Sequence, residues 1–198
     1  MQVSNFVCNR FLPSIFVLAF LFCAPGYSAF AQQTPDRYVA SAAVTVFGGY
    51  ANVAPDYGPT HNDGFFAGID YSRTFRHLPI VPSFELRGGE AKGTSVNEGT
   101  GLIGPKVSLT LLHRIHPYAN FLVGFGDIYY NQPFVVGYLH DSSVVKSVGG
   151  GVDFDLRFHL QAKIDYQYQF WNTGENQTYT PTVFGAGLAY RIPIRTGN

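Results

Sequence analysis

The clearest pattern in the chain is a strict alternation of apolar and polar residues over positions 158–171. The even positions are Phe158, Leu160, Ala162, Ile164, Tyr166, Tyr168 and Phe170, and the odd positions are His159, Gln161, Lys163, Asp165, Gln167 and Gln169. Because successive side chains of a strand point to opposite faces, this period of two predicts one strand with an apolar and a polar face. The stretch is longer than an ordinary strand of about 5–6 residues and is typical of a tilted strand that spans a membrane.

Several other stretches repeat this design. Apolar and polar residues alternate at 65–72, 84–87, 106–111, 147–155 and 183–192. At 44–50 and 118–130 the alternation is blurred, but β-branched and aromatic residues with glycines still favour strands. No helical period is sustained after residue 40. The pattern therefore predicts an all-β fold, a closed eight-stranded antiparallel up-and-down transmembrane β-barrel over about residues 40–192.

The segments between these strands differ in length. We expect short connections near 73–82, 113–117 and 155–159, and longer loops rich in turn residues near 51–63, 90–99, 127–143 and 172–181. In outer-membrane barrels the short turns face the periplasm and the long loops face the outside. Both ends of the barrel chain should then lie on the periplasmic side.

The chemistry of the two faces indicates which one meets lipid. The charged residues of the strands gather on one face: Asp70, Glu85, Arg87, Lys106, Asp153, Asp155, Lys163, Asp165 and Arg191. A soluble barrel with an apolar interior would show the same alternation, but a continuous aromatic face is costly in water. We therefore predict that Ile164 faces lipid and that Gln167 faces a mostly filled polar lumen. In that lumen opposite charges should pair, and inward glycines should make room for side chains.

Composition agrees with a membrane barrel and argues against a nucleic-acid partner. Charged residues make up 13% of the chain, about half the usual share, while aromatic residues reach 16%. The 13 basic and 13 acidic residues cancel, so no net basic field attracts a nucleic acid.

The first 31 residues are typical of a signal peptide. Arg10 provides the positive flank, residues 15–24 are apolar, and Ala29-Phe30-Ala31 has small residues where a signal peptidase needs them. A retained anchor is the alternative, but a membrane-spanning helix needs about 20 apolar residues. We expect cleavage before Gln32, which leaves residues 32–198 as the barrel domain. Cys8 and Cys23 both precede this site, so the remaining chain holds no thiol chemistry.

The mature chain resembles the porin-family outer-membrane β-barrels related to the OmpA transmembrane domain, and in particular their barrel-only members. The residues that carry the resemblance are Phe47-Gly48-Gly49-Tyr50, His116-Pro117-Tyr118-Ala119, and Gly149-Gly150-Gly151-Val152-Asp153-Phe154 with His159-Leu160 and Asp165-Tyr166. The resemblance implies an outer-membrane location and a structural or porin-like role. It also implies membrane lipids, including outer-leaflet lipopolysaccharide, and the outer-membrane assembly machinery as partners.

Four groups of residues could suggest other chemistry. Gly99-Thr100-Gly101-Leu102-Ile103-Gly104 spells a dinucleotide-binding motif, but Pro105 and the alternation beyond it exclude the helix that this motif needs. His113 and His116 provide too few ligands for a metal site. His140-Asp141-Ser142-Ser143 holds the residue types of a hydrolase triad, yet neighbours in sequence do not easily converge into one. Asp153, Asp155 and Asp165 could act as acid and base, but the cations on their face favour ion pairs.

We therefore predict no catalytic residues, no metal and no cofactor. Two alternatives stay open from the sequence. One is a lipid-modifying enzyme of the outer membrane, because lipid A deacylases and palmitoyl transferases are small barrels of this size. The other is an adhesion or ligand-binding barrel that acts through its extracellular loops, where tyrosines lie within 127–143 and 172–181.

Overall fold

The computed structural model describes residues 41–194, apart from 57–59, 76–77, 95, 112–113, 132–139 and 174–176. The predicted signal peptide and its cleavage site lie outside the described residues. All regular elements of the described part are strands: β1 (Ser41–Ala54), β2 (Asn62–Thr74), β3 (Ile80–Lys92), β4 (Val96–Leu109), β5 (Ile115–Tyr130), β6 (His140–Asp155), β7 (Leu160–Thr173), β8 (Gln177–Tyr179) and β9 (Thr182–Ile194). Within these residues, no helix has the length and apolar character to cross a membrane.

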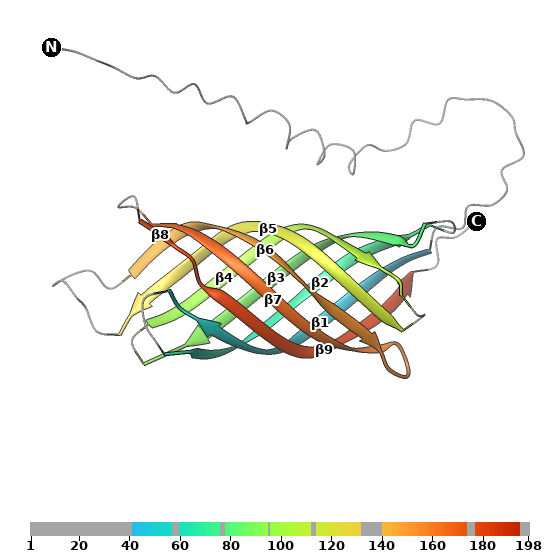
Figure 1. Cartoon of the computed structure of the whole chain (residues 1–198), viewed down its shortest axis with the longest axis horizontal. Coiled ribbons are helices and arrows are strands. Elements are labelled where there is room, and N and C mark those ends of the chain that lie inside the picture. The colour runs from blue at the N-terminus through green and yellow to red at the C-terminus, as the bar shows by residue number, and fades with distance from the viewer. Residues whose placement is uncertain are drawn as a thin grey trace, which may run out of the picture. The chain divides into compact units, whose positions relative to one another are not determined.

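The strands close into an antiparallel up-and-down barrel (Figure 1). Each strand from β1 to β7 pairs with the next, and β9 pairs with both β7 and β1. The short β8 pairs with the outer end of β7 and lies just before Pro181 and β9. The wall therefore has eight strands, β1 to β7 and β9, with β8 as a small addition. The predicted fold is confirmed.

The pairing register fixes the width of the barrel. Directly paired residues lead once around the wall through Ala43, Ser72, Ser83, Lys106, Asn120, Gly149, Gln167, Val183 and Val53. The path returns to β1 ten residues beyond its start, the difference between positions 53 and 43. This offset of ten residues is the shear of the barrel. With a rise of about 3.3 Å per residue and a strand spacing of about 4.8 Å, the shear tilts the strands by about 41° from the barrel axis and gives a backbone radius of about 8 Å. Long side chains from facing walls meet inside such a barrel.

The two faces of the wall have the predicted orientation. On β7, Gln167 is 1% exposed and Lys163 2%, whereas Ile164 and Tyr166 are 45% and 53% exposed. The outward residues of the other strands are mainly apolar, among them Val46, Phe65, Ile69, Phe84, Leu86, Ile103, Val107, Phe121, Val148, Phe184 and Leu188. The apolar face thus points outward on every side, which suits lipid, and the polar face points inward.

The structure corrects two predicted boundaries. Phe158 and His159 do not begin a strand but form the turn between β6 and β7, with φ of 57° and 63°. Two successive left-handed residues match the twist of a tight hairpin. The connection expected at 90–99 is also short, since β3 and β4 pair as far out as Lys92 and Asn97. Lys92 and Val96 leave only residues 93–95 between the two strands.

Candidate functional site

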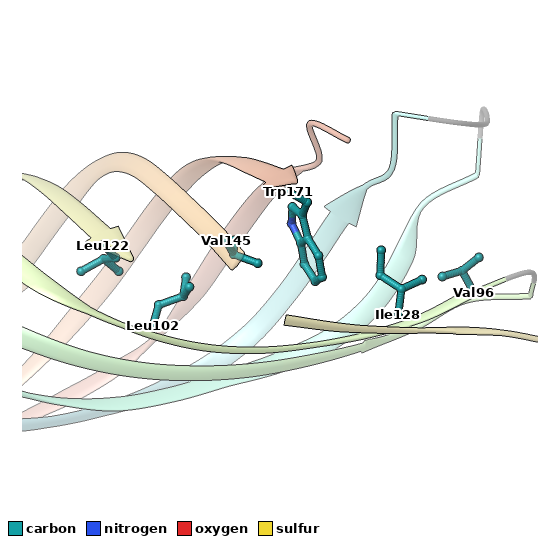
Figure 2. Packing of buried hydrophobic residues seen from close by; sticks show 6 residues of the cluster. All are labelled: Val96, Leu102, Leu122, Ile128, Val145 and Trp171. Atoms are coloured by element: carbon teal, nitrogen blue, oxygen red, sulfur yellow. The ribbon is translucent and has the colours of Figure 1, made fainter. Parts of the chain in front are cut away.

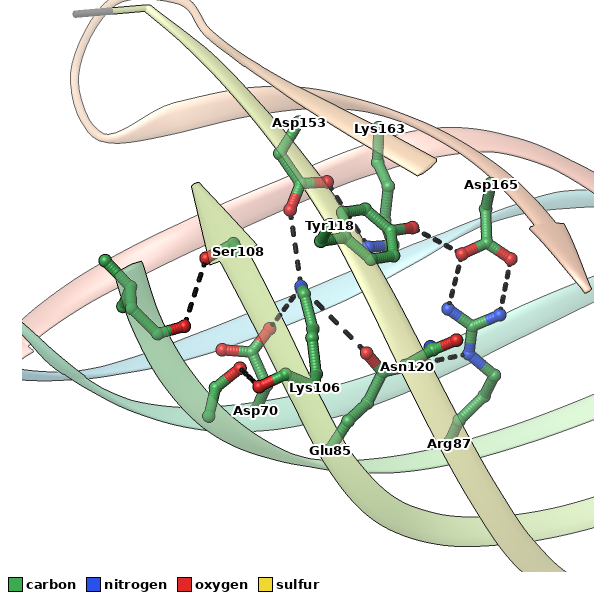
Figure 3. A network of polar contacts seen from close by, with 12 residues as sticks. Asp70, Glu85, Arg87, Lys106, Ser108, Tyr118, Asn120, Asp153, Lys163 and Asp165 are labelled. Carbon is green, nitrogen blue, oxygen red and sulfur yellow. Dashed lines mark hydrogen bonds and ion pairs between the residues drawn. The ribbon is translucent and has the colours of Figure 1, made fainter. Parts of the chain in front are cut away.

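A network of charged side chains crosses the lumen (Figure 3). Arg87 on β3 donates two hydrogen bonds to Asp165 on β7, at 2.5 and 2.8 Å, and a third to Glu85 Oε1 at 2.8 Å. Both Glu85 and Arg87 point inward because they lie two positions apart on one strand. All three side chains are at most 6% exposed. The guanidinium therefore neutralises two carboxylates that would otherwise be buried without a countercharge.

Lys106 on β4 forms the second centre of this network. Its Nζ lies 3.1 Å from Asp70 on β2, 3.3 Å from Asp153 on β6 and 3.9 Å from Glu85 Oε2. Lys163 on β7 contacts the other oxygen of Asp153 at 3.2 Å. The charges predicted to pair in the lumen do so, and these contacts connect strands on different sides of the barrel.

Uncharged side chains complete the network. The hydroxyl of Tyr118 donates to Asp165, and its ring lies 3.9 Å from Lys163 Nζ and 4.3 Å from Lys106 Nζ. Gln167 donates to Asn120 at 3.1 Å and accepts a hydrogen bond from Ser147 at 2.9 Å. Sequence reasoning missed Tyr118 and Asn120, since both lie on a strand whose alternation is blurred.

Two residues expected on the charged face lie apart from this centre. Asp155, at the end of β6, accepts hydrogen bonds from Gln161 at 2.6 Å and lies 2.9 Å from His116 Nε2. Arg191 on β9 donates to Thr74 at 3.5 Å. Both positions are beside the turn end of the barrel rather than in its middle.

An apolar cluster lies inside the barrel (Figure 2). A buried cluster consists of Val96, Leu102, Leu122, Ile128, Val145 and Trp171, with Tyr130 and Tyr179 packed against it. Leu102 and Leu122 lie near the middle of β4 and β5, whereas Ile128 and Trp171 lie near the ends of β5 and β7 away from the short turns. We call this cluster the apolar plug. Polar residues are buried beside it, since Trp171 donates to Gln169 at 3.0 Å and Tyr179 donates to Glu98 at 2.9 Å. The lumen was predicted to be polar, and the plug is an apolar cluster within it.

Aromatic residues also enter the lumen beneath the plug. Phe47 and Phe66 form a second buried cluster, and the guanidinium carbon of Arg87 lies 5.5 and 5.2 Å from their ring centres. A cavity of about 40 Å³ lies nearby, with Phe66, Arg87 and Gln167 among its lining residues. Space of this size holds only a few water molecules.

Inward glycines face the bulkiest lumen side chains, as the sequence predicted. A Cβ on Gly126 would lie 2.3 Å from the Trp171 ring, and one on Gly149 would lie 2.2 Å from Gln167. The same holds for Gly68 with Phe47, Gly185 with Phe66 and Gly151 with Tyr118. Glycine at these positions provides the volume that the opposite side chain fills.

The motifs that could suggest a cofactor or a metal have structural roles. Residues 99–104 lie within β4, which pairs with β3 and β5, so no helix follows them. His116 is paired with Asp155, and His113 lies outside the described residues. Among the described residues, no three His, Cys, Asp or Glu side chains form a group that could hold a metal ion.

Of the hydrolase-like residues, His140 and Ser142 lie on the outer wall near Asp127, whereas Ser143 is buried and faces the lumen. His140 Nε2 is 3.4 Å from Ser142 Oγ and 3.4 Å from Asp127 Oδ1, and the Ser142 hydroxyl donates to Asp127. In a catalytic triad the acid holds the ring nitrogen opposite to the one that faces serine. Here serine and aspartate share one nitrogen, so the arrangement is not that of a triad.

Comparison with known proteins supports the fold. No protein-family model and no curated protein sequence matches the chain. Among solved structures, Neisserial surface protein A matches with a TM-score of 0.51 and 15% identity, covering 75% of this chain and 96% of that protein. Ail, the attachment invasion locus protein of Yersinia pestis, matches with a TM-score of 0.52 and 13% identity, covering 77% and 99%.

These similarities and the outward apolar belt lead to the same conclusion. At such identities the likeness concerns the fold, which the chain shares with two eight-stranded bacterial surface barrels. A wall that is apolar outside and charged inside suits a bilayer and not water. This protein has the fold of an eight-stranded transmembrane β-barrel, which it shares with Neisserial surface protein A and Ail.

Proposed function

We propose that the protein is a structural outer-membrane barrel whose lumen is closed, so that it does not act as a general porin. The observation that carries this proposal is the succession of two fillings along the lumen. The charged network occupies its middle, and the apolar plug, with the buried Glu98 and Gln169 beside it, extends from there toward the loops. A solute would have to pass both.

The two fillings resist permeation for different physical reasons. In the plug, Leu122, Val145 and Trp171 are 0% exposed, so these closely packed side chains leave no space for a solute. In the network, an entering ion would compete with ion pairs that neutralise buried carboxylates. A backbone radius of about 8 Å leaves little space beside these side chains.

Planar-bilayer recording tests this proposal. The purified monomer should give small conductance steps or none, compared with a large porin measured in the same membrane. A Trp171→Ala, Leu122→Ala variant should conduct more than the wild type if the plug is the tighter closure. Large, stable steps from the wild-type monomer would contradict the closed lumen.

We propose no catalytic role for this barrel, because the one Ser–His–Asp cluster among the described residues lacks the arrangement of a triad. As partners we propose the lipids of both leaflets, lipopolysaccharide in the outer one, and the outer-membrane assembly machinery. A lipid profile of cells with and without the protein tests the proposed absence of a catalytic role. A deletion that changes the acyl composition of lipid A would contradict it.

A further inference from the structure

The three turns at the periplasmic end share one chemical pattern. These turns join β2 to β3, β4 to β5 and β6 to β7. An exposed arginine lies in or beside each turn: Arg73 is the last residue but one of β2, and Arg114 and Arg157 lie in the other two turns. Each turn also has an exposed bulky apolar residue: Leu78 is 55% exposed, Leu111 50% and Phe158 88%.

The two ends of the barrel carry opposite charge. Among the described residues of the periplasmic end, Arg73, Arg114, Arg157 and Arg191 are accompanied by one carboxylate, Asp155. The described exposed residues of the outer end include Asp56, Asp63, Glu90 and Asp127, with Lys92 and Lys146 as the cations. The periplasmic end is therefore basic and the outer end acidic, although the whole chain has no net charge.

Packing within the barrel explains neither the exposed arginines nor the exposed apolar residues of these turns. Phe158 is almost fully exposed, and it lies in a turn with φ of 57° that side chains other than glycine rarely adopt. Leucine, phenylalanine and arginine together on a surface are typical of elements that lie in a membrane interface. There the apolar side chains enter the acyl boundary, and arginine reaches the phosphates of the headgroups.

We propose that these three turns form a collar that binds anionic phospholipid headgroups of the inner leaflet. We call it the periplasmic collar and define it by its exposed arginines and apolar residues, Arg73, Arg114, Arg157, Leu78, Leu111 and Phe158. Charge complementarity selects this occupant, because a basic rim attracts acidic lipid by about 1 kcal/mol per arginine near the surface. The collar depends on the orientation of the barrel in the membrane but not on the closed lumen, so either proposal can fail alone.

Spin-labelled lipids test the collar directly. The full protein is reconstituted into phosphatidylethanolamine vesicles that contain phosphatidylglycerol, and the motionally restricted fraction is measured for labelled phosphatidylglycerol and for labelled phosphatidylethanolamine. The wild type should prefer phosphatidylglycerol. The preference should fall by up to about five-fold for each arginine that becomes glutamine in an Arg73→Gln, Arg114→Gln, Arg157→Gln variant.

A matched control removes charge at the other end. Lys92→Gln with Lys146→Gln should leave the phosphatidylglycerol preference unchanged, and heat-modifiable gel mobility confirms that each variant is folded. Phe158→Ser should weaken retention of both lipids, since it removes the apolar contact and not the charge. A wild type without preference for phosphatidylglycerol would overturn the proposal, as would a triple variant that keeps it. If the collar binds an acidic periplasmic protein and no lipid, the wild type would show no preference for phosphatidylglycerol.

Discussion

Arg87 on β3 and Asp165 on β7 form a bidentate ion pair across the lumen, although 78 positions separate them in the chain. The pair lies where Tyr118 also donates to Asp165 and where Glu85 also accepts from Arg87. Removal of Arg87 would therefore leave the carboxylates of Glu85 and Asp165 buried without their shared cation.

Arg87→Ala should destabilise the barrel strongly. The change leaves Asp165, which is 1% exposed, without its countercharge, and breaking a buried pair typically costs roughly 3–5 kcal/mol. Urea unfolding in detergent or lipid measures the loss. The double variant Arg87→Met, Asp165→Leu should be more stable than Arg87→Ala, because Glu85 is then the one carboxylate that loses Arg87, and it keeps Lys106 at 3.9 Å.

An exposed ion pair provides the comparison for this experiment. Lys92 contacts Glu90 at 3.1 Å, with side chains 70% and 45% exposed. Lys92→Ala should change the free energy of unfolding by less than about 1 kcal/mol. Similar losses for Lys92→Ala and Arg87→Ala would show that burial does not govern these pairs.

The orientation of β7 can be tested by cysteine labelling. Apart from Cys8 and Cys23 the chain has no cysteine, so a single cysteine at Ile164 or Gln167 is unique after removal of the signal peptide. Cysteine at 164 should resist a water-soluble maleimide, and a fluorophore there should be quenched by lipid-attached spin labels. A fluorophore at 167 should escape the lipid quencher. If lipid quenchers never reach position 164, the prediction that this face of the barrel lies in a membrane is wrong.

Ile164→Arg gives an energetic counterpart to the labelling. An arginine on the lipid face near the bilayer midplane costs roughly 2–4 kcal/mol in a barrel. Gln167→Arg carries no lipid penalty, but it enters a crowded lumen where Gly149 faces the side chain. We expect Ile164→Arg to lower folding yield in vesicles, and an unchanged yield would contradict its place in the apolar belt.

Gly126→Ala should disturb the apolar plug. The new Cβ would lie 2.3 Å from Trp171 Cη2, so the indole ring has to move, and overpacking of this kind costs typically 1–3 kcal/mol. Trp171 is the single tryptophan of the chain, so its fluorescence reports the shift. Gly101→Ala is the control, because a Cβ there meets nothing within 4 Å. Equal spectra for wild type and Gly126→Ala would argue against the described packing.

The signal peptide stays a prediction of the sequence. Mass spectrometry of the protein from the membrane fraction should find Gln32 as the first residue. An intact residue 1 in that fraction would contradict cleavage after Ala31.

The fold could be predicted because lipid and lumen impose opposite chemistry on alternate residues. This is clearest on β7 up to Phe170, where each lipid-facing residue is apolar or aromatic and each lumen residue is polar. The same argument fails where the lumen itself is apolar. Phe47, Leu122 and Trp171 are inward residues that look like lipid-facing ones, which is why β1 and β5 appeared blurred and why the plug was missed.

The partners within the lumen could not be predicted for a different reason. Asp165 contacts Arg87 and not another cation because of the pairing register around the whole wall, which no single segment encodes. Local turn chemistry limited how well the ends of the strands could be predicted. The glycine-rich stretch near 99 suggested a loop but continues β4, and Phe158 suggested a strand but forms a turn with unusual backbone angles.

The cross-lumen contacts also have a consequence for how the barrel forms and comes apart. Hairpins between neighbouring strands can form early, because their loops are short. Lys106 can meet Asp70 and Asp153 within the contiguous sheet from β2 to β6, before the barrel closes. Arg87 on β3 and Asp165 on β7 lie on opposite strands of the eight, so they can meet only once the sheet has curled into its closed form. The Arg87–Asp165 pair should therefore act on the lifetime of the folded state more than on the speed of folding, so variants of this pair should unfold faster while they fold at nearly the same rate.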